Sequence, residues 1–167
     1  MLKHCVFFLL SCIVFQGCCL FCFEEEDYKN GSDYEPVYLF KSELDQFIQL
    51  RTPQGISNSG KIYVIGDLLF VGEEREGFHI FDNSDPKHPE KMFFLQVPGA
   101  SDLAIRNNVM YINQATDLVA IQFDLASEAI KITKRIENTF PELRSPDGFV
   151  AYDIPEAGVV VKWIPKK

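Results

Sequence analysis

Few side chains in this chain have the types and the spacing that catalysis or metal binding requires. No two of its three histidines are spaced like the ligands of a zinc ion. His79 falls within an apolar run that predicts a strand, so we expect it to be structural, and His88 lies in a turn between prolines, where we expect it to be solvated. The sequence has no nucleophile elbow, phosphate-binding loop or zincin motif. We therefore predict no catalytic residue, no metal site and no cofactor.

Acidic side chains gather in two predicted turns. The acidic run at residues 73–76 has the charge to bind calcium or a basic partner, but we interpret it as the solvated tip of a hairpin. Asp82 and Asp85 have the oxygens to hold a cation, although aspartates in such turns more often bond to the neighbouring backbone. Neither group is predicted to be a metal site.

The five cysteines all lie within the first 22 residues. The rest of the chain therefore has no disulfide framework, and its fold must rest on packed elements. Cys19 and Cys22 have the spacing of a thioredoxin-like motif, but they lie in an apolar leader and not in the βαβ setting that such redox chemistry requires. We predict no redox role for them.

Residues 1–22 have the order of parts that an export signal has. A short positive start is followed by an apolar run and then by Gly17 directly before Cys18. This order resembles the lipobox of bacterial lipoproteins, in which the cysteine carries lipid and becomes the new N-terminus, so we predict lipidation of Cys18. Because Phe15 and Gln16 depart from the usual lipobox, Cys12 stays open as the alternative. An uncleaved anchor is a third interpretation, since the uncharged run is about long enough to span a bilayer.

The composition changes sharply after the leader. Residues 23–33 are strongly polar and acidic, which is typical of a flexible tether. Residues 34–59 form a lead-in segment with a short helix predicted over residues 42–48, capped by Ser42 and carrying its apolar side chains on one face. We expect this helix to cover a strand edge or one end of the domain that follows.

Residues 60–167 carry a repeat with a period of about 41 residues. Short β-branched and aromatic runs, separated by turn residues, predict four strands in each repeat. The apolar pattern of residues 62–71 recurs at residues 103–112, and that of residues 78–81 recurs at residues 118–121. A period near 40 with four strands per unit is typical of β-propeller blades. The sequence therefore predicts an all-β, propeller-like fold of about two full four-stranded blades and part of a third, preceded by the short helix.

The segment at residues 78–89 resembles that of a known repeat family. Its order, Phe-His-Ile-Phe-Asp-Asn-Ser-Asp-Pro-Lys-His-Pro, resembles the defining segment of the LVIVD repeat family. Residues 97–105 resemble the family's link into the next repeat, and residues 117–121 resemble its second copy, with Gln122 in place of the expected aspartate. The resemblance implies a β-propeller in an exported, anchored protein of the bacterial envelope. It implies no catalytic residues.

The last part of the chain provides less than one further unit. Residues 158–164 predict a strand, whereas residues 140–148 are rich in loop-forming residues. Closed propellers use roughly four to eight blades, and the residues after the leader make just over three units. We expect the domain either to close with other copies of itself or to form an open stack, and to associate or be marginally stable alone.

The formal net charge of −8 at pH 7 narrows the choice of partners. It argues against nucleic acid, which requires a basic face, and against purely electrostatic docking on anionic lipid. We predict a non-enzymatic binding or scaffold module of the bacterial cell envelope. Its N-terminal lipid would hold it to the outer membrane or a periplasmic face, with protein partners or other copies of itself at its blade edges. The alternative is a propeller enzyme, or an accessory domain of one, with a site at the blade axis.

Overall fold

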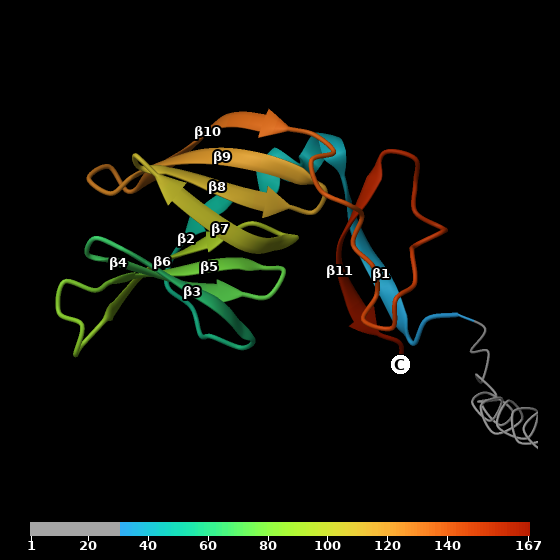
Figure 1. The fold of residues 1–167 in the computed structure, drawn as a ribbon, viewed down its shortest axis with the longest axis horizontal. Helices are drawn as coiled ribbons and strands as arrows, with labels where there is room; N and C mark the ends of the chain where they lie inside the picture. The colour runs from blue at the N-terminus through green and yellow to red at the C-terminus, as the bar shows by residue number, and fades with distance from the viewer. Residues whose placement is uncertain (1–30) are drawn as a thin grey trace, which may run out of the picture. The chain divides into compact units, whose positions relative to one another are not determined.

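Eleven β-strands and one short helix make up residues 31–167, the part of the chain that the computed structural model describes (Figure 1). The strands form three antiparallel sheets, none of them closed, and this confirms the all-β prediction for these residues. The predictions for the signal or anchor, for lipidation of Cys18 or Cys12, and for most of the acidic tether lie outside the described residues.

The first sheet has five strands in the order β2-β6-β5-β4-β3. Its strands are β2 (Gln49–Arg51), β3 (Ser59–Ile65), β4 (Leu68–Glu73), β5 (Gly77–Asp82) and β6 (Glu90–Gln96). From β3 to β6 each strand pairs with the next along the chain, because short turns join them. The prediction of four strands here was too low, since β2, from the lead-in segment, pairs with the outer edge of β6.

The second sheet has four strands in the order β10-β9-β8-β7. Its strands are β7 (Ala100–Arg106), β8 (Val109–Gln114), β9 (Asp117–Asp124) and β10 (Ala129–Ile136). Asn107 and Asn108 both have positive φ, of 50° and 59°, in the turn between β7 and β8. Asparagine tolerates this conformation, which a two-residue turn needs if its twist is to match that of the two strands.

The main core lies between these two sheets, where alternate side chains of each strand point inward. Phe70, Phe78 and Ile80 of the first sheet and Met110 and Ile121 of the second are at most 2% exposed and belong to one hydrophobic cluster. Burying each side chain of this size contributes about 1.5–3 kcal/mol. The contact between the sheets therefore supplies most of the apolar burial in this part of the chain.

The third sheet joins the two ends of the described chain. It pairs β1 (Tyr34–Phe40) with β11 (Gly158–Pro165), which confirms the predicted final strand. A smaller core forms where Val159 and Val161 of β11 pack with Leu44 and with Ala115 of the second sheet. This packing attaches the third sheet to the rest of the domain.

The predicted helix forms, but its start differs from the prediction. It is a 3-10 helix, η1 (Lys41–Phe47), that continues directly from β1. Ser42 therefore lies inside its first turn, Phe40 occupies the capping position, and no side chain caps the helix. Of the two positions expected for the helix, the edge of β6 is covered by β2 instead. Leu44 anchors η1 in the smaller core, and its carbonyl accepts from Gln114 at one end of the second sheet.

Candidate functional site

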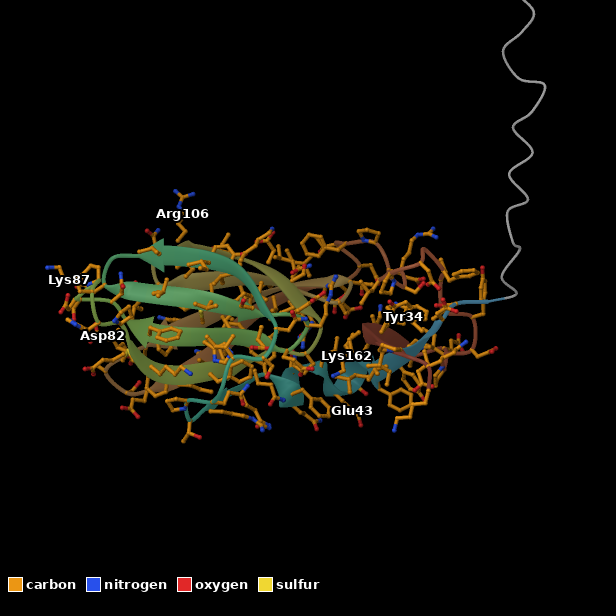
Figure 2. The ribbon with its side chains drawn as sticks, turned by 90° about the horizontal axis from the view of Figure 1, so that it is seen from below. Tyr34, Glu43, Asp82, Lys87, Arg106 and Lys162 are labelled. Atoms are coloured by element: carbon orange, nitrogen blue, oxygen red, sulfur yellow. The ribbon has the colours of Figure 1, made fainter. Side chains whose placement is uncertain are left out.

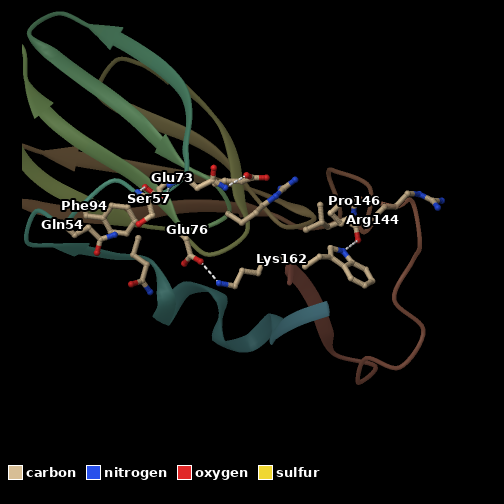
Figure 3. A pocket seen from close by; sticks show the side chains of 15 residues that line it. Gln54, Ser57, Glu73, Glu76, Phe94, Arg144, Pro146 and Lys162 are labelled. Atoms are coloured by element: carbon tan, nitrogen blue, oxygen red, sulfur yellow. Dashed lines mark hydrogen bonds and ion pairs between the residues drawn. The ribbon is translucent and has the colours of Figure 1, made fainter. Parts of the chain in front are cut away.

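A polar hollow of about 790 Å³ lies beside the β4–β5 turn (Figure 3). Five parts of the chain line it: the loop at residues 54–58, the turn at residues 73–76, β6, the loop at residues 143–146, and β11. Its size falls within the range of ligand sites in proteins, but its lining is more polar than most. The hollow is therefore the best candidate for a recognition site in the described chain.

The β4–β5 turn presents Arg75 to the hollow through an unusual backbone conformation. Arg75 has a φ of 60°, a region that residues other than glycine rarely adopt. Its N–H donates to the Ala100 carbonyl at 3.2 Å, and its carbonyl accepts from the Gly99 N–H at 2.8 Å. Gly77 follows with a φ of 144°, and a Cβ there would lie 2.0 Å from the Leu95 carbonyl oxygen. These contacts determine the position of the turn.

Glu73, at the start of this turn, is buried and fully engaged. It is 6% exposed, and its carboxylate lies 2.9 Å from Nε2 of His79, which is 1% exposed. The carboxylate also accepts the backbone N–H groups of Ser57 and Asn58. Burial alone would raise the pKa of Glu73, but these hydrogen bonds outweigh it and hold the pKa below the usual value.

The Glu73 network corrects one prediction and bears on another. The run at residues 73–76 is not a solvated hairpin tip, because its first carboxylate is buried beneath the loop at residues 54–58. His79 has the structural position expected for it: its ring also packs against Phe94 at a centroid distance of 4.9 Å. Glu73 is 6% exposed where it borders the hollow and His79 only 1%, so the pair has little contact with solvent.

An ion pair crosses the hollow from the turn to β11. Lys162 Nζ lies 2.6 Å from Glu76 Oε1, and both side chains stay partly exposed, at 36% and 44% (Figure 3). The next residue, Trp163, also lines the hollow and donates its indole N–H to the Leu143 carbonyl at 3.0 Å. Consecutive residues of a strand point to opposite faces, so the edge of β11 and not one of its faces borders the hollow.

Arg75 is the least satisfied cation of the hollow. Its guanidinium is partly buried, and its one hydrogen bond to another residue of the described range 31–167 is a long one of 3.4 Å to the Gly99 carbonyl. Desolvation lowers the pKa of Arg75, and the nearby charge of Glu74 opposes that effect. Arg144 also belongs to the lining, but its side chain points away from the hollow in Figure 3 and bonds to the Gly148 carbonyl.

The turn that contains Asp82 and Asp85 lies far from the hollow, as the positions of Asp82 and Lys162 in Figure 2 show. Asp82 accepts the Ser84 N–H at 2.8 Å, and Asp85 accepts the Lys87 N–H at 3.0 Å. Both aspartates therefore stabilise the turn, as predicted. The His88 side chain is 79% exposed, as expected, and contacts Asp85 at 2.9 Å.

The β8–β9 turn occupies the equivalent place in the second sheet but is closed. Gln114 and Asp117, which flank it, are at most 1% exposed. Arg135 of β10 donates to Asp117 at 3.0 Å and to Gln114 at 2.6 Å, while Gln114 donates to the Leu44 carbonyl of η1 at 3.4 Å. This turn is thus used to hold the second sheet against η1.

Sequence reasoning did not identify the residues that matter most at the hollow. Arg75 was grouped with its acidic neighbours, and Lys162 and Trp163 were assigned only to a strand. One available signal was the arginine itself: a cation in the middle of a four-residue turn that is otherwise acidic. No local signal indicates that β11 lies beside this turn, because that contact joins distant parts of the chain.

The comparisons with known proteins add no family to this picture. No protein-family profile, no curated protein and no solved structure matches the chain. Within residues 31–167, no group of three or more histidine, cysteine, aspartate or glutamate side chains is arranged to hold a metal ion. The helical part of these residues includes no segment of sufficient length and apolarity to cross a membrane.

Proposed function

We propose that the protein is a non-enzymatic binding module of the bacterial cell envelope, and that the polar hollow beside the β4–β5 turn is its recognition site. The observation that carries the proposal is the construction of the hollow. Five separate parts of the chain converge on it, and a buried network at Glu73 holds the turn in place while Arg75, Glu76 and Lys162 remain partly accessible. Pre-organised polar groups around an open space favour binding over any other use.

Catalysis is the weaker candidate because the carboxylates that line the hollow already have partners: Glu74 accepts from the Asn58 amide, and Glu76 pairs with Lys162. Glu73 and His79 are buried, and their carboxylate and ring bond to each other. A general acid or base must reach the proton that it transfers. We therefore assign Glu73 and His79 the role of supporting the turn, and we retain the enzyme only as the alternative that the experiment below excludes or supports.

We further propose that the two larger sheets are neighbouring blades of an incomplete propeller of the LVIVD type. Strands β3–β6 and β7–β10 each run as a four-stranded meander, and the two sheets pack face to face through one core. The β1–β11 pair would be part of a third blade, made from both ends of the described chain. If copies complete the ring, sedimentation velocity will show a mass that rises with concentration. A strictly monomeric species at all concentrations contradicts the assembly.

The chain's single tryptophan offers a direct test of binding, because Trp163 lines the hollow. Purified protein is titrated with separated saccharide, peptide and lipid fractions of cell envelope while Trp163 fluorescence is recorded. We expect one fraction to change the emission, and mass spectrometry to recover the ligand unaltered. Recovery of a chemically changed ligand would support the enzyme instead, and no change with any fraction contradicts the proposed site.

Two lysine variants form a matched pair for this titration. Lys162→Met removes the cation that pairs with Glu76 across the hollow. Lys131→Met removes an exposed lysine of β10. We expect the first variant to weaken the fluorescence response about tenfold, as loss of a charge-assisted hydrogen bond does, and the second to leave it unchanged. Equal responses in the two variants would place the ligand outside the hollow.

The proposed anchor is tested separately. We propose export, cleavage before Cys18 and lipid on that residue, supported by Gly17, the apolar run and the polar residues that follow. Mass spectrometry of the mature N-terminus should show an acylated Cys18, and Cys18→Ser should abolish acylation. Loss of acylation in Cys12→Ser instead identifies the alternative site, and an intact, unacylated Met1 contradicts the lipoprotein.

A further inference from the structure

The side chains of the hollow point to one class of ligand. We propose that the hollow binds an acidic saccharide, a short run of hydroxyl-rich sugar units that carry carboxylates, and that Arg75 binds the carboxylate of one unit. This inference rests on the proposed function, since it specifies the ligand of the same site. It is carried by the state of Arg75, by the amide groups around it, and by Trp163.

Arg75 provides the contact for a carboxylate. A guanidinium has five N–H donors in a fork that matches a carboxylate. Among residues 31–167, only one of those of Arg75 has an acceptor, the Gly99 carbonyl, and that bond is long, at 3.4 Å. The guanidinium is also partly desolvated, so a ligand carboxylate would meet it with less competition from water. Its backbone is held at a φ of 60°, an unfavourable conformation of the kind that concentrates at functional sites.

The neighbouring polar groups suit hydroxyls. Gln54, Asn58 and Gln96 contribute amide side chains to the lining, and an amide both donates and accepts hydrogen bonds, as a hydroxyl does. The carboxylates of Glu74 and Glu76 accept hydrogen bonds and border the same space. A ligand with many hydroxyl groups satisfies donors and acceptors together, which an apolar ligand of the same size does not.

Trp163 adds a flat apolar surface to the hollow. Its indole N–H is already bonded to the Leu143 carbonyl at 3.0 Å, so the orientation of the ring is set. The ring is half-buried and lines the hollow, where it can pack against the apolar C–H face of a sugar. An aromatic face beside polar groups matches a ligand that has one apolar face and a polar rim.

The two carboxylates beside Arg75 favour a singly charged carboxylate over a doubly charged phosphate as its partner. Glu74 and Glu76 lie on either side of Arg75 in the turn, and the whole chain carries a net charge of −8. A densely charged polyanion would be repelled by these groups at short range. One carboxylate per sugar unit carries less charge than a phosphate dianion, so its repulsion by Glu74 and Glu76 is smaller.

The test measures binding of uronate oligomers to the full chain by calorimetry and by Trp163 fluorescence. The probes are tetramers of galacturonate, mannuronate and glucuronate, each compared with its uncharged methyl ester. We expect at least one free acid to bind about tenfold or more tightly than its ester, because the ester loses the charge-assisted bonds to Arg75. We also expect weaker binding at higher salt.

Arg75→Gln should weaken binding of that acid about tenfold and should reduce the difference between acid and ester. Arg106→Gln is the matched control, because Arg106, the last residue of β7, is exposed and its side chain projects away from the domain in Figure 2. Circular dichroism melts of both variants show whether they are folded. Equal binding of acid and ester, or no binding of any acid by folded protein, overturns the inference. Binding of a neutral envelope ligand instead would overturn it while leaving the proposed function intact.

Discussion

The β4–β5 and β8–β9 turns take the same position in two similar sheets but have opposite uses. In the first sheet the turn has three residues between its flanking pair, and it leaves Arg75 and Glu76 at the open hollow. In the second sheet the turn has two residues between Gln114 and Asp117, and Arg135 and η1 close over it. Buried polar groups at one turn thus build a site, and at the other they join elements of the fold.

One residue, Gly99, forms backbone hydrogen bonds to both turns. The Gly99 N–H donates to the Arg75 carbonyl at 2.8 Å, and the Gly99 carbonyl accepts the Ala115 N–H at 3.2 Å. Its φ of 85° favours glycine, and a Cβ there would come within 3.0 Å of the Ala115 nitrogen. The open and the closed turn are therefore both positioned by hydrogen bonds to the backbone of Gly99.

The largest effect is expected at the closed turn. Asp117→Ala leaves Arg135, which is 15% exposed, without its buried carboxylate partner, so the free energy of unfolding should fall by about 3 kcal/mol. Urea denaturation measures the loss. Lys61→Ala is the control, because its pair with Asp102 is exposed, at 65% and 51%, and should contribute less than about 1 kcal/mol. Similar losses in the two variants would mean that the closed turn is not a special contact.

A smaller loss is expected at the open turn. Glu73→Ala removes the acceptor of the Ser57 and Asn58 N–H groups and of His79, and stability should fall by about 2 kcal/mol. Limited proteolysis should then cut the loop at residues 54–58 faster. Glu74→Ala, an exposed neighbour, should change stability by no more than about 0.5 kcal/mol. An uncut loop in Glu73→Ala would show that Glu73 does not hold it.

The pH dependence of stability should distinguish the ionised from the protonated form of Glu73. Its pKa in the folded chain lies below the ordinary value of 4.5 that we take for the unfolded chain. The ionised carboxylate therefore contributes its full stabilisation above that value, and the contribution is lost as pH falls through the lowered folded pKa. The stability gap between the wild type and Glu73→Gln should be constant near neutral pH and narrow in acid. A gap that widens in acid would reverse the sign of the shift.

The smallest expected effect is a gain in stability. Arg75→Gly relieves a left-handed conformation that costs other residues roughly 1 kcal/mol, so the variant should melt slightly higher than the wild type. The same change removes the guanidinium from the hollow, and binding should weaken although stability rises. A stability–function trade-off of this kind is typical of recognition sites. If Arg75→Gly is less stable than the wild type, its backbone is not strained and its position has another cause.

Much of the fold could be predicted from local features. The runs at 62–71 and 103–112 form strands β3–β4 and β7–β8, because β-branched and aromatic residues and turn-forming residues act over a few positions. Asp82 and Asp85 were assigned to turn stabilisation for the same local reason. The added strand β2 and the uncapped start of η1 were not predictable in this way, because both depend on what lies beside them.

The sequence by itself determined that this is a β-rich chain, in which similar apolar runs recur after about 41 residues and all five cysteines lie within the first 22 residues. Only the tertiary structure decided that Glu73 is buried, that Gln114 and Asp117 close against η1, and that Lys162 meets Glu76 across a hollow. The physical reason is the range of the interactions. Strand and turn preferences act between near neighbours, whereas the desolvation and charge of a side chain depend on segments that folding brings together from distant parts of the chain.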